Sequence, residues 1–148
     1  MAILVEFEYH SYMIANSEKL IGKKVARIAT RESWMDGEII SPCVDIFIEE
    51  SSQVCWRLYY DDENWVWCLV AYKAGFPKID SGIGDKNLGW PVVVPDGCKN
   101  FIGQEITAIE ESEADGSLRV RVELDKIGAI EATINLQTNK EELKFTVE

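Results

Sequence analysis

One short segment occurs twice in this chain, and this repeat limits the possible folds more than any other feature. The segment LIGKKVARIA begins at Leu20, and the similar segment FIGQEITAIE begins at Phe101, 81 positions later (101 − 20). The glycine and the main apolar residues occupy the same places in both segments. A chain of 148 residues is long enough for one substantial core. We therefore expect residues 1–148 to form a single domain with an internal duplication.

The repeat continues beyond these segments. After a gap of five residues the register becomes 76, and apolar residues again fall on apolar residues. The matched sets are Val54, Trp56, Leu58, Tyr60, Trp67 and Leu69 in the first copy and Ile130, Ala132, Ile134, Leu136, Leu143 and Phe145 in the second. Apolar residues at every second position are typical of strands with one buried face. The copies span about residues 15–72 and 100–148, and a connection rich in Gly and Pro, 73–99, joins them.

These patterns predict a mainly β protein. Polar stretches such as DDEN separate the alternating runs, so each copy should be an antiparallel β-meander of about four strands. Two meanders that each have one apolar face should pack together as a sandwich or an open barrel. The predicted shared core comprises Trp56, Leu58, Trp67, Leu69, Ile134, Leu143 and Phe145. Alternation of Ile3, Val5, Phe7 and Tyr9 adds a further strand. The alternative is an α+β fold with a helix near 17–30, because the repeated segment also fits a helical face.

The composition excludes some classes of partner. The net charge is −11, from 15 Lys and Arg against 26 Asp and Glu, which disfavours nucleic acid as a partner. It favours steering towards a protein that carries positive charge. No apolar run reaches the ~20 residues of a membrane helix. The first residues lack the basic region of a signal peptide, so we expect a cytoplasmic protein.

The sequence contains no recognisable catalytic or metal-binding motif. The four cysteines, Cys43, Cys55, Cys68 and Cys98, have no CxxC spacing, and His10 is the single histidine. No serine lies in the setting of a nucleophile elbow. We therefore expect no metal, no cofactor and no enzymatic activity.

The two copies differ on the outer face of their second hairpin. In the second copy this face is polar, with Glu131, Thr133, Asn135, Glu142, Lys144 and Thr146. In the first copy it carries Cys55, Arg57, Tyr59, Val66, Cys68 and Val70. An apolar face of this kind should be covered by the N-terminal strand, by the connection, or by a partner. Tyrosine and arginine on an apolar background are typical of interface centres.

The sequence thus favours a non-catalytic acidic protein that acts by protein–protein binding, as an inhibitor, an adaptor or an immunity-like protein. The predicted binding residues are Arg57, Tyr59, Trp65, Val66, Cys68, Val70 and Trp90. A second copy of the chain, giving a homodimer, is the competing occupant of the same face. The alternative function is a small-molecule-binding or hydrolytic β-barrel, with Trp34, Trp90 and the connection at its mouth.

Overall fold

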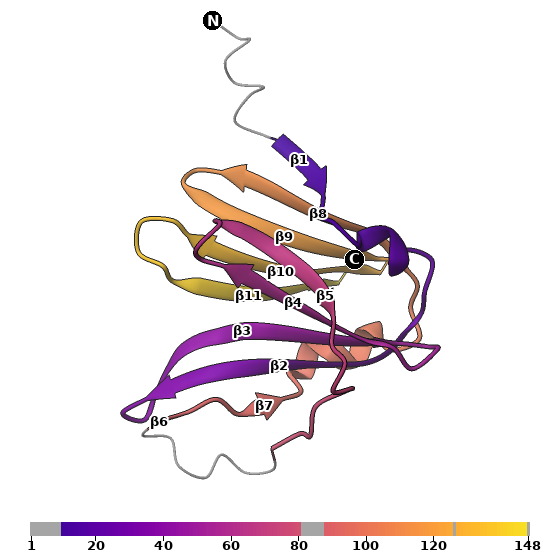
Figure 1. Cartoon of the computed structure of the whole chain (residues 1–148), viewed down its shortest axis with the longest axis horizontal. Helices are drawn as coiled ribbons and strands as arrows, with labels where there is room; N and C mark the ends of the chain where they lie inside the picture. Colours follow the sequence, from indigo (N-terminus) through magenta and orange to yellow (C-terminus); the bar gives the residue numbers. More distant parts are fainter. Residues whose placement is uncertain (1–9, 81–87, 126, 148) are drawn as a thin grey trace, which may run out of the picture.

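The computed structural model describes residues 10–80, 88–125 and 127–147, and these residues form a mainly β structure, as predicted (Figure 1). Two antiparallel sheets pack together, and the described strands do not close into a barrel. The expected strand through Ile3, Val5, Phe7 and Tyr9 lies outside the described residues.

Each copy supplies the four long strands of one sheet. The first sheet has the order β5-β4-β3-β2, and two short strands, β6 and β7, pair with β2. Its strands are β2 (Val25–Met35), β3 (Glu38–Glu50), β4 (Cys55–Asp61), β5 (Val66–Ala71), β6 (Leu88–Gly89) and β7 (Val92–Val93). The second sheet has the order β1-β8-β9-β10-β11. Its strands are β1 (His10–Met13), β8 (Ile106–Ala114), β9 (Ser117–Leu124), β10 (Gly128–Asn135) and β11 (Glu141–Val147).

The helical alternative for residues 17–30 is wrong. Only a short 3-10 helix, η1 (Ser17–Lys19), occurs there, and β2 begins at Val25. Gly22 has a φ of 87°, a left-handed conformation that ends a helical turn. The second copy repeats this arrangement with η2 (Asp96–Phe101) and with Gly103 at a φ of 83°.

The repeated segments bind each other, which explains why the sequence contains both. Four backbone hydrogen bonds join them: Gly22 N to Ile106 O (2.8 Å), Gly103 N to Val25 O (2.7 Å), Val25 N to Gln104 O (2.9 Å) and Ile106 N to Lys23 O (2.9 Å). A shift of 81 residues turns the first bond into the second and the third into the fourth. Lys24 and Glu105, also 81 apart (105 − 24), form an antiparallel bridge at the centre. The copies are therefore related by a pseudo-twofold axis through this bridge.

The register predicted for the later strands is wrong by two residues. Trp65 N donates to Asp61 O at 2.8 Å, and Asn139 N donates to Asn135 O at 2.8 Å. These equivalent loop bonds are 74 residues apart (139 − 65, 135 − 61), whereas 76 was predicted. The difference from 81 is seven residues, because β2 and β3 extend further than β8 and β9. An error of two keeps every side chain on its face, since strands have a period of two.

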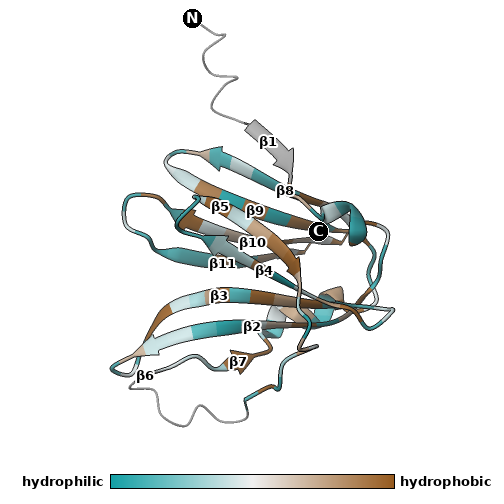
Figure 2. Ribbon diagram, in the orientation of Figure 1, coloured by the Kyte–Doolittle hydropathy of each residue, from teal (hydrophilic) through white to brown (hydrophobic). Residues whose placement is uncertain are grey.

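The predicted shared core is confirmed. Trp56, Leu58, Trp67, Leu69 and Ile134 are buried in one cluster that draws on both sheets, and Leu143 and Phe145 are partly buried against it. Hydrophobic and hydrophilic residues alternate along β9, so one face of this strand points into the cluster (Figure 2). Leu20 and Phe101, which open the repeated segments, are both fully buried in the same cluster.

Candidate functional site

The structure brings five of the seven predicted binding residues together. Arg57 and Tyr59 on β4 pair with Val70 and Cys68 on β5, and Val66 lies on the same face of β5. All five are half-buried. Their side chains alternate with those of the core residues Leu58, Trp67 and Leu69, so they lie on the outer face of the first sheet.

The outer face of β5 borders an apolar groove of about 380 Å³. We call it the β5 groove. Its lining residues are Ile14, Ala15, Asn16, Tyr59, Val66, Trp67, Cys68, Leu69, Val70 and Glu111. Four of the predicted residues line it, and Arg57 adjoins it because its guanidinium carbon lies 4.0 Å from the centre of the Tyr59 ring.

The described residues of the connection and of the end of β5 cover the part of this outer face next to Cys55. Tyr72, Phe76 and Val92 pack there against Phe47 and Cys55, and they form a second hydrophobic cluster with Ala29. Cys55 is 3% exposed as a result. Tyr59, Val66, Cys68 and Val70 are not part of this cluster, and they stay accessible in the groove.

The arginines of the outer face are paired with carboxylates. Asp45, which is 3% exposed, forms ion pairs with Arg57 and with Arg31, the latter at 3.5 Å. Arg27 binds both oxygens of Glu49, at 2.9 and 2.8 Å. Such pairs hold the guanidinium groups flat against aromatic rings, as Arg57 lies on Tyr59. These three arginines therefore share two carboxylates, Asp45 and Glu49, and are held in place within the chain.

Among the described residues, β5 is an edge strand, and side chains cap its outer edge. Asn16 Nδ2 donates to Leu69 O at 3.0 Å, and Trp67 N donates to Glu111 Oε1 at 3.2 Å. Glu111 is 2% exposed. Caps of this kind protect an edge strand from pairing with other chains. A partner at the β5 groove would thus meet side chains rather than a free backbone edge.

The cysteine thiols are not activated. Burial raises the pKa of Cys55 to about 11 and that of Cys98 to about 12. Burial also raises the pKa of Cys43 and, to a smaller extent, that of Cys68 in the groove. A protonated thiol is a poor nucleophile, so all four cysteines behave near neutral pH as small apolar side chains.

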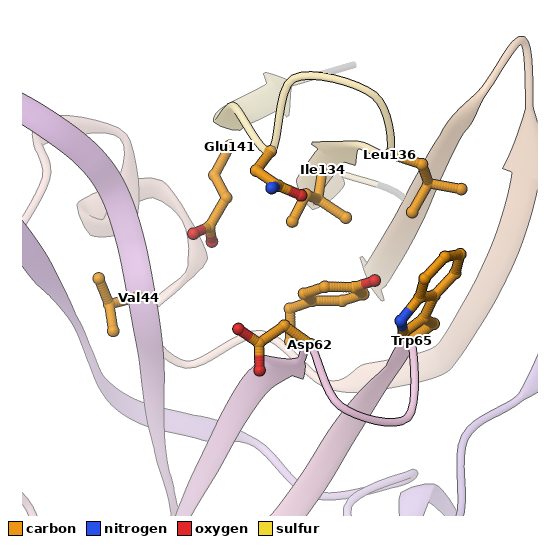
Figure 3. A pocket seen from close by; sticks show the side chains of 8 residues that line it. Val44, Asp62, Trp65, Ile134, Leu136 and Glu141 are labelled. Carbon is orange, nitrogen blue, oxygen red and sulfur yellow. The ribbon is translucent and has the colours of Figure 1, made fainter.

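Trp65 lies at a different site, a cavity of about 570 Å³ between two hairpin loops. We call it the end cavity. Its lining residues are Val44, Tyr60, Asp62, Trp65, Ile134, Leu136, Asn139 and Glu141. Asp62 and Trp65 come from the β4–β5 hairpin and face Ile134, Leu136 and Glu141 from the β10–β11 hairpin (Figure 3). Trp90, which is 55% exposed, lines neither site.

The two copies build the end cavity together. Tyr60 and Ile134, Asp62 and Leu136, and Trp65 and Asn139 are pairs of equivalent residues, each 74 apart (134 − 60, 136 − 62, 139 − 65). The cavity therefore lies on the pseudo-twofold axis, like the Lys24–Glu105 bridge.

One of the differences between the copies replaces a large buried side chain by a smaller one at this cavity. Trp67 of the first copy is 2% exposed and donates from Nε1 to Leu118 O at 3.2 Å. Its equivalent in the second copy is Glu141 (141 − 67 = 74), which is much smaller and lines the cavity. Burial raises the pKa of the Glu141 carboxyl, although hydrogen bonds from Ser41 and Cys43 oppose this effect.

The sequence-based interpretation did not find the end cavity. The register of 76 matches Glu141 with Trp65 at the hairpin tip, and Trp67 with Leu143. It therefore assigns the replacement by glutamate to an exposed loop residue instead of to the buried Trp67. The signal was present in the loops. Asp61 and Asn135 both accept backbone N–H bonds through their side chains, from residues two and three positions later.

The part of the chain that the structure describes contains no group of three His, Cys, Asp or Glu side chains that could hold a metal ion. None of its helices has the length and hydropathy needed to cross a membrane. Comparisons of the chain with protein-family models, with curated proteins and with solved structures found no significant match.

Proposed function

We propose that this is a non-catalytic binding protein whose β5 groove accepts a segment of a positively charged protein partner. The observation that carries the proposal is the groove itself: Tyr59, Val66, Cys68 and Val70 form an accessible apolar face beside the capped edge of β5. Apolar surface of this kind on a folded chain is a common mark of a binding site.

The charge of the chain supports a basic protein rather than a second copy as the occupant. Each chain carries a net charge of −11, so two identical chains repel each other, whereas a basic partner is attracted. Asp61, the last residue of β4, pairs with Val66 at one end of the groove, and Glu63 lies in the loop that follows. The arginines of the outer face form ion pairs with Asp45 and Glu49, so their guanidinium groups are engaged within the chain.

The barrel form of the alternative function is not retained. The described strands form an open sandwich rather than a closed barrel, and Trp34 Nε1 in this sandwich donates to Glu32 Oε1 at 3.0 Å. The end cavity offers a different place where a small molecule could bind.

The proposal can be tested with two variants that add the same charge at different places. Val66→Lys puts an ammonium group in the groove, opposite Asp61, where the strand pair tolerates it. Val54→Lys adds the same charge at an exposed position, 44% accessible, that does not line the groove. Capture of a basic partner from extract at low salt should fall about tenfold with Val66→Lys and stay unchanged with Val54→Lys.

Two results would contradict the proposal. Equal loss with both variants would show that only the net charge matters and that the groove is not the site. A wild-type dimer in sedimentation experiments that Val66→Lys dissociates would show that the occupant is a second copy of the chain.

A further inference from the structure

We propose that the end cavity binds a small organic cation that carries an ammonium group. This site lies outside the β5 groove and does not depend on the protein-binding role. The cavity volume, about 570 Å³, is within the range of small-molecule sites. Its walls combine two carboxylates, two aromatic rings and aliphatic side chains.

The carboxylates supply the negative charge. Asp62 and Glu141 project from opposite hairpins into the same space (Figure 3). Within the described residues neither has a cationic group within 4.0 Å, and the neighbouring Lys140 is exposed. A cation placed in the cavity would be attracted by both carboxylates.

The aromatic side chains supply the second element of cation recognition. Tyr60 and Trp65 both line the cavity, and a positive charge is attracted to the face of such rings. Trp65 is 66% exposed, although it is the bulkiest residue of its loop. The Tyr60 ring packs edge-on against the buried Trp67, with 5.6 Å between ring centres, which fixes its place in the wall. Ile134, Leu136 and Val44 would contact the alkyl groups of the ligand.

The replacement of Trp67 by Glu141 in the second copy also points to a ligand. At the equivalent place in the first copy, a tryptophan fills the interior. A half-buried carboxylate packs less well and is poorly solvated, so it does not help the fold. A ligand that is positively charged would use both the space and the charge that this replacement provides.

The experiment compares two probes of the same shape by titration calorimetry of the full chain. Choline is the cationic probe, and its neutral isostere has carbon in place of the quaternary nitrogen. Choline should bind about tenfold more tightly than the isostere. Equal affinity for the two probes, or no binding of choline at millimolar concentration, would overturn the proposal.

Three variants locate the site. Glu141→Gln removes the charge and keeps the shape, and Trp65→Asn removes the ring. Asparagine suits the left-handed backbone at this position, because the equivalent Asn139 has a φ of 60° against 58° for Trp65. Each variant should weaken choline binding about tenfold, whereas Glu63→Gln, in the same loop but outside the lining, should not. If Glu63→Gln weakens choline binding as much as Glu141→Gln, binding depends on the overall negative charge, and choline does not bind in the end cavity.

Discussion

At the scale of single residues, Glu141 combines a role in the end cavity with a loss of stability. Burial raises the pKa of its carboxyl above the ordinary value of 4.5. A carboxyl with a higher pKa in the folded chain than in the unfolded chain binds more protons when folded. The stability of the fold therefore falls as the pH rises from about 4.5 through the folded pKa of Glu141, and the loss is complete above that value.

Glu141→Gln should consequently raise the stability of the protein at pH 7. The urea midpoint should be higher for the variant at pH 7, and the difference should disappear at pH 4, where both chains are neutral at this position. The other titratable groups around Glu141 are unchanged in the variant, so the comparison isolates Glu141 itself; they are Asp62, Asp45, Cys43 and the adjacent Lys140. A variant that is less stable than the wild type at pH 7 would show that the carboxylate is structural, held by Ser41 and Cys43.

The sequence could predict some site residues and not others, for a physical reason. Alternation within β4 and β5 places Arg57, Tyr59, Val66, Cys68 and Val70 on one face without any knowledge of the sheet partners. Trp65 and Trp90 lie in connections, where no strand period applies. The sequence therefore does not indicate which residues lie next to them. The end cavity needs residues from two hairpins, and only the tertiary fold brings these together.

At the scale of elements, the glycines of the repeated segments test the pseudo-twofold relation. Gly22 and Gly103 have positive φ values, 87° and 83°, and an added Cβ would meet no atom within 4 Å at either position. Gly22→Ala and Gly103→Ala should therefore destabilise only through backbone strain, by about 1 kcal/mol each. Equal losses in denaturant unfolding would support equivalent roles for the two segments.

Gly97→Ala serves as the contrast, because its mechanism is different. A Cβ at Gly97 in η2 would lie 2.6 Å from Cγ of Phe145, which is already packed against the core. We expect a loss nearer 2–3 kcal/mol, typical of overpacking. A loss at Gly97 no greater than at Gly22 would show that β11 shifts freely and that its packing on η2 is loose.

The elements themselves were largely predictable, whereas their register was not. Period-two alternation identified the long strands, and the ambiguity at 17–30 arose because four apolar residues fit either period. The register could also be obtained from the Asp-Gly turns. Asp36-Gly37 and Asp115-Gly116 both adopt positive φ values at the first hairpin of each copy. These pairs are 79 residues apart (115 − 36), a value between 81 for the repeated segments and 74 for the later strands. The first hairpin of the second copy is therefore shorter than that of the first copy on both sides of its turn.

At the scale of the whole molecule, the pseudo-twofold axis joins two ends of different character. At one end the repeated segments form a closed set of hydrogen bonds around Lys24 and Glu105. At the other end the copies have diverged, and the difference between Trp67 and Glu141 leaves a cavity. The duplication thus accounts for the architecture. Both candidate sites lie where the two copies differ: the end cavity at Trp67 and Glu141, and the β5 groove on the apolar outer face of the first copy.

The shared core predicts that the two copies unfold as one unit. The main cluster mixes residues of both sheets, so neither sheet can keep its buried face without the other. All five tryptophans lie outside the second copy, between Trp34 and Trp90, so their fluorescence reports on the first copy and the connection. Circular dichroism in the far ultraviolet reports on the strands of both copies.

Unfolding in urea followed by the two signals should therefore give coincident transitions with the same midpoint and the same slope. A fragment of residues 100–148 alone should lack strand signal, because a single four-stranded sheet with one apolar face exposes too much of that face to water. Fluorescence that changes before the circular dichroism, together with a folded 100–148 fragment, would show two independent domains. In that case the hydrogen bonds between the repeated segments would join the copies without making them depend on each other.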